Sequence, residues 1–400
     1  MASIPIIEYA IGFFTLYITV FFLLVYLENR SEVKRHPQPP KKLPSFTIII
    51  PAYNEQDSIE RTVQSVLDSG YPRAKMQVIV VDDGSRDATW QRMQKFKRTK
   101  GVLLLRKPNG GKAAALNFAL KRAKGEFIAT LDSDCFVEKG AIQKMLGYFW
   151  EDDKIMAVTS VTKVENPRNA VEKLQRIEYL VSVFARRVQQ FIDAIAVTPG
   201  PLSVYRARVF KELGGFDEKS VLEDQEMGFR IQSNHYKIRG SMDAVVHTTV
   251  PPTFKMLLLQ RVRWYRGGLR NVAKYKHMLS RDYGDLGMFV MPLGIVSMLM
   301  MFVIFGLSLL QYSHGASAID LITRPSVAWL GIQATHIIAV VIFALSAFWV
   351  YLGMKHFEGE ALTPLYLLLY LIIYAPMVTL FWIATLIYEA KGGKPTWLTR

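Results

Sequence analysis

Residues 46–55 read FTIIIPAYNE and residues 77–85 read QVIVVDDGS, and these two stretches decide the fold class. Each is a short run of mostly β-branched residues that ends in polar side chains, with helical periodicity in the residues between them. The same rhythm continues through a strand expected at 102–105, a helix at 112–124 and a strand at 126–131. Strands that alternate with helices in this way predict an α/β domain built on a mostly parallel, doubly wound sheet.

Acidic side chains follow three of the expected strands. They are Glu55, Asp82, Asp83, Asp132 and Asp134. Because ligands bind beyond the carboxyl ends of the strands in such sheets, these carboxylates are expected at one binding edge. Asp132 and Asp134 are two residues apart, which in extended backbone turns both carboxylates to one side, where they can share Mg²⁺ or Mn²⁺. An isolated Asp-x-Asp is more often a solvated turn, so the interpretation depends on the neighbouring acids.

The strand expected at 102–105 ends in a basic turn instead. Residues 106–112 read RKPNGGK, and a helix is expected to begin at Lys112. Backbone amides of a Gly-Gly turn together with a lysine at a helix start suit phosphate oxygens. The spacing is not that of a Walker A motif, and a flexible turn is the alternative interpretation.

Glu223 and Asp224 stand directly before another expected helix. Either they form an acidic first turn favoured by the helix dipole, or one of them is a general base held near the metal. No covalent nucleophile is expected, because neither Cys135 nor any serine has a base motif beside it. Since Cys135 is the only cysteine, a disulfide-stapled domain is excluded.

Four apolar stretches are each long enough to cross a bilayer as a helix, which takes about 20 residues. They cover residues 9–27, 288–310, 327–354 and 365–388. Basic residues follow the first stretch and none precedes it, so the positive-inside rule puts the N-terminus outside and the next domain in the cytosol. Parity then puts the C-terminus outside, whereas Lys391, Lys394 and Arg400 favour the inside. A re-entrant C-terminal segment is the alternative.

The stretch from Thr253 to Lys276 is amphipathic at helical spacing and rich in arginine. It is expected to lie along the membrane surface, and binding of anionic lipids, rather than nucleic acid, is the expected reason for much of the net charge of +15. Lipid binding is the expected role of Arg261, Arg270, Lys274 and Lys276. The helix expected over 171–192, which contains Arg186 and Arg187, is interpreted as a domain surface.

The chain therefore divides into five predicted parts. They are an N-terminal transmembrane anchor (1–29), a cytosolic α/β domain (30–250), an amphipathic interfacial segment (251–285), three transmembrane spans (286–390) and a basic tail (391–400).

The motifs stand in a specific order, which is Pro-Ala-Tyr-Asn-Glu, Asp-Asp-Gly-Ser, Gly-Gly-Lys, Asp-Ser-Asp, Glu-Asp and, at 260–264, Gln-x-x-Arg-Trp. This set resembles the family 2 inverting glycosyltransferases of the GT-A (Rossmann-like) fold. Within that family it is similar to the processive membrane synthases of cellulose, chitin, hyaluronan and poly-N-acetylglucosamine. The similarity covers roughly residues 46–271, and Gln-x-x-Arg-Trp after Glu-Asp is its most specific motif.

The resemblance implies roles for the matching residues. Those implied to bind the nucleotide-sugar donor are Tyr53, Glu55, Asp82, Asp83, Lys112 and Asp132. Asp83 is favoured over Asp82 for the nucleotide base, Lys112 would approach the diphosphate, and Asp134 with Asp132 would hold the metal.

On the acceptor side, the resemblance implies that Asp224 is the base. Gln260, Arg263 and Trp264 would close over the diphosphate and stack the acceptor sugar. The family usually has threonine before Glu-Asp, where this chain has Leu222. The carboxylates remain, so the departure leaves the assignment of the base intact.

The leading hypothesis is an integral protein of the cytoplasmic membrane that transfers a sugar, expected from a UDP-sugar, to the growing end of a β-linked polysaccharide and exports the chain. The alternative is a single addition to a membrane lipid such as polyprenyl phosphate or a glycolipid. A membrane receptor or transporter with a nucleotide-sensing domain is the third, and the complete set of acids and bases argues against it. The residues do not indicate which sugar is used or the oligomeric state.

Overall fold

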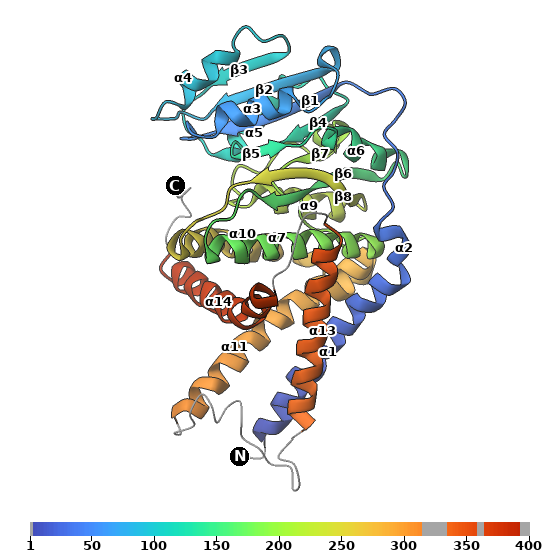
Figure 1. The fold of residues 1–400 in the computed structure, drawn as a ribbon, viewed down its shortest axis with the longest axis vertical. Helices are drawn as coiled ribbons and strands as arrows, with labels where there is room; N and C mark the ends of the chain where they lie inside the picture. Colours follow the sequence, from blue (N-terminus) through green and yellow to red (C-terminus); the bar gives the residue numbers. More distant parts are fainter. Residues whose placement is uncertain (1–2, 314–333, 358–363, 393–400) are drawn as a thin grey trace.

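The computed structural model describes residues 3–313, 334–357 and 364–392 (Figure 1). An α/β domain forms one end of the molecule and long apolar helices form the other. Two helices lie between them, which are α7 (Ala170–Gln189) and α10 (Phe254–Lys274).

The described strands form one mixed sheet in the order β3-β2-β1-β4-β7-β6-β8-β5. The first half is parallel and consists of β1 (Phe46–Ala52), β2 (Met76–Asp82), β3 (Val102–Arg106) and β4 (Phe127–Thr130). The second half consists of β7 (Ser203–Arg206), β6 (Ile155–Val164), β8 (Lys237–Thr248) and β5 (Cys135–Val137). In it β6 and β8 are parallel, whereas β7 and β5 run antiparallel to their neighbours. The prediction of a mostly parallel α/β domain is confirmed.

Strand β1 is buried on both faces, because helices cover both sides of the sheet. Ile48 and Ile50 point into one core and Ile49 points into the other, as the twofold alternation of a strand requires. The first core is covered by α3 (Ile59–Leu67) and α6 (Ala141–Gly147), and the second by α5 (Lys112–Leu120) and α9 (Glu223–Ser233). The remaining short helices are α2 (Arg30–Val33), α4 (Thr89–Met93) and α8 (Arg208–Glu212).

The long helices are α1 (Ser3–Glu28), α11 (Met291–Ser313), α13 (Ala334–Lys355) and α14 (Pro364–Ala390). Among the described residues, four stretches are long and apolar enough to cross a membrane, and they cover Tyr9–Glu28, Leu286–Leu307, Ile337–Lys355 and Pro364–Ala390. The four expected apolar stretches are therefore found, although the start of the third, residues 327–333, lies outside the described residues.

Helix α14 lies beneath α7 and α10, whereas α1 and α13 run away from the α/β domain toward the opposite end of the molecule (Figure 1). Near its start, the Tyr366 hydroxyl accepts a hydrogen bond from Lys173 of α7 at 3.1 Å. Near its end, Glu389 pairs with Arg266 of α10 at 2.7 Å and with Arg270 at 2.8 Å. Both ends of α14 thus contact the layer next to the α/β domain, an arrangement that fits the re-entrant alternative for this segment.

Helix α7 is not an outer domain surface, so that interpretation is wrong. It packs between the sheet and the apolar helices, and the Phe184 ring packs at a tilt against Trp349 of α13, with ring centroids 4.9 Å apart. Arg187 is 3% exposed, and its guanidinium donates to the backbone carbonyls of Glu32 and Gly240 at 2.6 and 3.1 Å. A helix that packs between two layers needs apolar side chains on more than one face. The spacing of apolar residues along the sequence predicts an amphipathic helix in either case, so it does not show that a second layer covers α7.

Candidate active site

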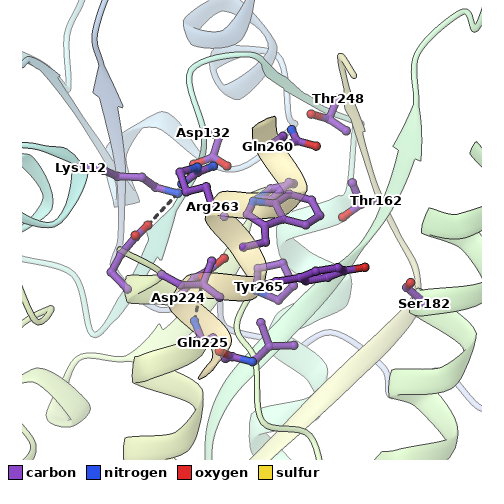
Figure 2. A pocket seen from close by; sticks show the side chains of 18 of the residues that line it. Lys112, Asp132, Thr162, Ser182, Asp224, Gln225, Thr248, Gln260, Arg263 and Tyr265 are labelled. Atoms are coloured by element: carbon purple, nitrogen blue, oxygen red, sulfur yellow. Dashed lines mark hydrogen bonds and ion pairs between the residues drawn. The ribbon is translucent and has the colours of Figure 1, made fainter. Parts of the chain in front are cut away.

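A cavity of about 890 Å³ lies where the carboxyl ends of β1 and β4 face helices α7, α9 and α10 (Figure 2). The acidic strand ends and the Gln-x-x-Arg-Trp segment border the same space. The predicted site residues that line it are Tyr53, Glu55, Asp83, Lys112, Asp132, Asp134, Glu223, Asp224, Gln260, Arg263 and Trp264. Among the predicted residues, Asp82 does not line this cavity.

The two aspartates at the end of β2 have different surroundings. Asp82 is fully buried and pairs with Arg106 at 2.9 Å. Asp83 lines the cavity and accepts hydrogen bonds from the amides of Gly110 and Gly111 at 3.1 and 2.7 Å. The glycine amides that were expected to meet phosphate therefore bind Asp83 in this structure. They fix the turn before α5 and hold Asp83 at the cavity wall.

Lys112, the first residue of α5, lies between two carboxylates (Figure 2). Its Nζ is 2.6 Å from Oδ1 of Asp132 and 2.9 Å from Oε1 of Glu223. Burial alone would lower the pKa of Lys112, but the charges of Asp132, Glu223 and Asp224 raise it well above its usual value. Lys112 therefore stays charged and joins the end of β4 to the start of α9.

Asp224 lies in the first turn of α9 and lines the cavity. Desolvation raises its pKa, the charge of Glu223 raises it further and Lys112 partly offsets both, which leaves the pKa at about 6. The Asp224 backbone carbonyl accepts a hydrogen bond from the Thr198 hydroxyl at 2.7 Å, which anchors this turn. A carboxylate of this kind is a stronger base than an ordinary aspartate and is still ionised at neutral pH.

Asp132, Asp134 and Cys135 bring possible ligand atoms within 4.8 Å of one another. Cys135 is buried, and burial together with the charge of Asp134 raises the pKa of its thiol well above the usual range. A protonated thiol is a poor metal ligand, so the two carboxylates are the useful donors. Hard oxygen donors fit Mg²⁺ or Mn²⁺, and the residues present therefore fit the expected divalent cation.

Gly200 belongs to this site although it is not among the predicted residues. Its carbonyl accepts a hydrogen bond from the amide of Asp132 at 3.2 Å. A Cβ atom at Gly200 would collide with the carboxylate of Asp132. The sequence signal is a glycine between Pro199 and Pro201, which is typical of a turn where the backbone must approach another group closely.

Arg261 is buried inside the protein, and the prediction that it binds lipid is wrong. It is 1% exposed, binds Glu178 of α7 at 2.7 Å and lies over the ring of Trp264 at 4.0 Å from the centroid. Arg270 and Lys274 also bind carboxylates of the protein, at 2.8 and 2.7 Å. Helix α10 packs against α9 and α14 and is joined to α7 by the Arg261–Glu178 pair, so part of its positive charge is paired with carboxylates of the protein.

Helix α10 touches the start of α9 through a glycine. A Cβ atom at Gly267 would lie 2.6 Å from Cβ of Leu222, the residue just before the Glu-Asp pair. This close approach keeps Trp264 and Asp224 on the same cavity.

The side of the cavity next to the long helices is apolar. Met291, Ile295 and Met298 of α11 line it, together with Trp382 of α14. Because Met291, Ile295 and Met298 belong to a stretch apolar enough to cross a membrane, the cavity extends from the acidic strand ends to one of the candidate spans.

The sheet, its acidic strand ends and the covering helix α10 define a GT-A domain placed on a layer of apolar helices. Residues 47–214 match the family model of glycosyl transferase family 2, so this part of the chain is similar to that family.

Known proteins resemble the chain in sequence and in structure. The poly-beta-1,6-N-acetyl-D-glucosamine synthase of Staphylococcus aureus (strain MSSA476) is 31% identical over 229 residues, 57% of this chain and 55% of that protein. The synthase of Staphylococcus epidermidis is 29% identical over 230 residues, with the same coverage. The chain thus matches about half the length of these relatives. A mannosyltransferase from Pyrobaculum calidifontis, solved with GDP-Man and Mn²⁺, superposes with a TM-score of 0.63 at 20% identity over 97% of this chain and 100% of that one.

Proposed function

We propose that this chain is an inverting glycosyltransferase that moves a sugar from a nucleoside diphosphate to an acceptor hydroxyl at a membrane surface. One observation carries the proposal, which is that Asp134, Asp224 and Trp264 line a single cavity. The catalytic domain would face the cytosol, as the basic residues after the first apolar stretch indicate.

In the proposed reaction, Asp224 takes the proton from the acceptor hydroxyl as that oxygen attacks the anomeric carbon. Its raised pKa of about 6 makes it a better proton acceptor than an ordinary aspartate while leaving it ionised at pH 7. The attack comes from the side opposite the leaving diphosphate, so the anomeric configuration inverts. Cys135, a buried thiol, offers no competing nucleophile.

For the donor, we propose that Lys112 and Arg263 stabilise the charge of the leaving diphosphate and that Tyr53 and Asp83 hold the base. Asp132 and Asp134 would hold a divalent cation, which would supply further charge neutralisation when bound. A UDP-sugar is the donor that the sequence motifs lead us to expect, whereas the Pyrobaculum enzyme was solved with GDP-Man and Mn²⁺. The first assay should therefore test UDP-sugars and GDP-sugars as donors, each with Mg²⁺ and with Mn²⁺.

Two acceptors are proposed. Elongation of a β-linked polysaccharide is supported by the names of the relatives, and Trp264 is an aromatic platform suited to a terminal sugar. Addition of a sugar to a membrane lipid is supported by the apolar wall that Met291, Ile295 and Met298 give the cavity.

The product distinguishes the two acceptors. Purified full-length protein in lipid nanodiscs would be incubated with labelled nucleotide sugars and Mg²⁺ or Mn²⁺, and the product sized and extracted. A high-molecular-weight, glycosidase-sensitive product supports the polymer, and a small product that enters organic solvent supports the lipid. If no labelled sugar leaves its nucleotide under any of these conditions, the proposed activity is wrong.

Replacement of Trp264 tests the acceptor platform. We expect Trp264→Ala to slow transfer to the acceptor about tenfold, which corresponds to a lost stacking contribution of about 1.4 kcal/mol, while hydrolysis of the donor by water changes less than about threefold, because stacking holds only the acceptor. Equal loss of both reactions would contradict this role of Trp264.

A further inference from the structure

Arg186 of α7 lines the cavity and has no partner in the described part of the chain. Its Nε atom is buried without a hydrogen bond, and no ion pair joins its guanidinium to a carboxylate. The neighbouring arginines differ from it, because Arg187 is bound by backbone carbonyls and Arg261 by Glu178. A desolvated guanidinium without an anion is costly, so an unpaired one facing a cavity indicates that the cavity receives an anion.

Two hydroxyl groups from the same helix also face this part of the cavity. Tyr179 and Ser182 line it, and the spacing of residues 179, 182 and 186 puts the three side chains on one face of α7. Burial raises the pKa of the Tyr179 phenol, so it remains a hydrogen-bond donor. A guanidinium flanked by two hydroxyl donors matches the several acceptor oxygens of a phosphate group.

The Arg186 end of the cavity is separate from the diphosphate end. Ser182 lies across the cavity from Lys112 and Asp132 (Figure 2). The charge of Asp224 acts on both Lys112 and Arg186, so the proposed base lies near both cations. An anion on Arg186 would therefore belong to the acceptor and not to the donor.

The surroundings of Arg186 indicate what carries the anion. The cavity that it faces is closed on one side by the apolar wall of Met291, Ile295 and Met298 from α11. An apolar chain fits that wall, and a phosphate fits the donors on α7. Among the nearby carboxylates, Glu178 is held by Arg261 and Glu223 by Lys112, whereas Asp224 acts on Arg186 through its charge without forming an ion pair with it.

We propose that Arg186, with Tyr179 and Ser182, binds the phosphate of a lipid-linked acceptor whose hydrocarbon chain lies along α11. This inference rests on the proposed transferase function and chooses the lipid acceptor within it. The phosphate is a binding group only, and the sugar is still received by a hydroxyl beyond it, next to Asp224.

The test compares matched acceptors in one assay. Full-length protein in nanodiscs of neutral lipid would receive labelled donor and one of three acceptors with the same terminal sugar. They are a polyprenyl-phosphate glycoside, a neutral alkyl glycoside of similar chain length and a water-soluble sugar phosphate. Arg186→Gln removes the charge, Arg186→Lys keeps it, and Arg168→Gln, at an exposed position just before α7, is the control.

We expect Arg186→Gln to raise KM for the lipid-phosphate acceptor about tenfold or more, as loss of a charge-assisted hydrogen bond would, with kcat changed less than threefold. Arg186→Lys should recover part of the loss, and Arg168→Gln should match the wild type. KM for the neutral glycoside and the rate of donor hydrolysis should not respond to Arg186→Gln. Direct binding of the polyprenyl phosphate, measured without donor, should fall with the same variant.

Several outcomes would overturn the inference. If Arg186→Gln weakens the neutral and the phosphate-bearing lipid equally, the residue does not recognise phosphate. If the soluble sugar phosphate binds as tightly as the lipid and depends equally on Arg186, the anion is not lipid-borne. Donor hydrolysis separates these results from failure of the transferase itself, since a protein that never cleaves the donor contradicts the proposed function and not only the acceptor site.

Discussion

At the scale of single residues, Asp224 controls the expected pH dependence of the reaction. An ordinary aspartate has a pKa of about 4, so it would remain an active base down to that pH. Desolvation, Glu223 and Asp132 raise the Asp224 pKa to about 6, while Lys112 lowers it. We expect kcat to fall as the pH drops through about 6, and a stopped assay of sugar transfer between pH 4.5 and 8 would measure it. An acid limb near pH 4 would contradict the assignment.

Ionisation of the Asp224 carboxylate should lower the free energy of unfolding of the protein. A folded-state pKa above the unfolded value means that the protonated form is favoured in the native protein, so its contribution to stability is lost as the pH rises through about 6. Asp224→Asn is therefore expected to raise Tm at pH 7.5, with a smaller gain at pH 5. Thermal unfolding of both proteins at the two pH values checks this. A Tm gain that grows toward low pH would contradict the sign.

The close contact between Gly200 and Asp132 can also be tested by mutation. Gly200→Ala should abolish transfer and weaken donor binding at least tenfold, because the new methyl group would occupy the space of the Asp132 carboxylate. Gly306→Ala is the control, since a Cβ at Gly306 on α11 meets nothing within 4 Å. Nucleotide binding measured by calorimetry would report the effect, and normal binding by Gly200→Ala would show that Asp132 does not need this glycine.

At the scale of elements, the contact between α9 and α10 keeps the base and the acceptor platform together. Two adjacent glycines provide a matched test, because a Cβ at Gly267 would lie 2.6 Å from Leu222 whereas one at Gly268 has no neighbour nearer than 3.6 Å. Gly267→Ala should lower kcat at least tenfold, and Gly268→Ala should change it little. Leu222→Ala combined with Gly267→Ala should restore part of the rate. Equal effects of the two glycine variants on kcat would contradict a role for the Gly267–Leu222 contact in catalysis.

The same scale shows what could be predicted from the sequence. The strands and the acidic residues after them follow from local periodicity and from the rule for parallel sheet edges, and both were found where expected. The partners of Arg261 and Arg187 could not be predicted, because periodicity gives a helix an apolar and a polar face but not the layers that cover them. Arg186 was placed on a surface for the same reason. Gly200 was missed because its role depends on a contact with Asp132 from a distant part of the chain.

At the scale of the whole molecule, the placement of α14 makes a prediction about topology. Because Tyr366 contacts α7 and Glu389 contacts α10, the end of α14 should lie on the same side of the membrane as the α/β domain. Cysteines introduced at Lys391, at Asp153 in the α/β domain and at Ser3 would be labelled with an impermeant maleimide in a Cys135→Ser background. The cysteines at positions 391 and 153 should be labelled from the same side of the membrane, and the cysteine at position 3 from the opposite side. Labelling of 391 together with 3 would favour a full crossing by α14.

The role of Asp224 as the base is tested most directly by acceptor-dependent nucleotide release. This release would be measured for the wild type, Asp224→Asn and Asp153→Asn, and donor affinity would be determined for each protein. Asp153 is the control because its side chain is 93% exposed. We expect Asp224→Asn to lose about 10²-fold to 10⁴-fold in kcat, the range for removal of a general base, while its donor affinity stays within about threefold. Near-normal turnover by Asp224→Asn would contradict this role.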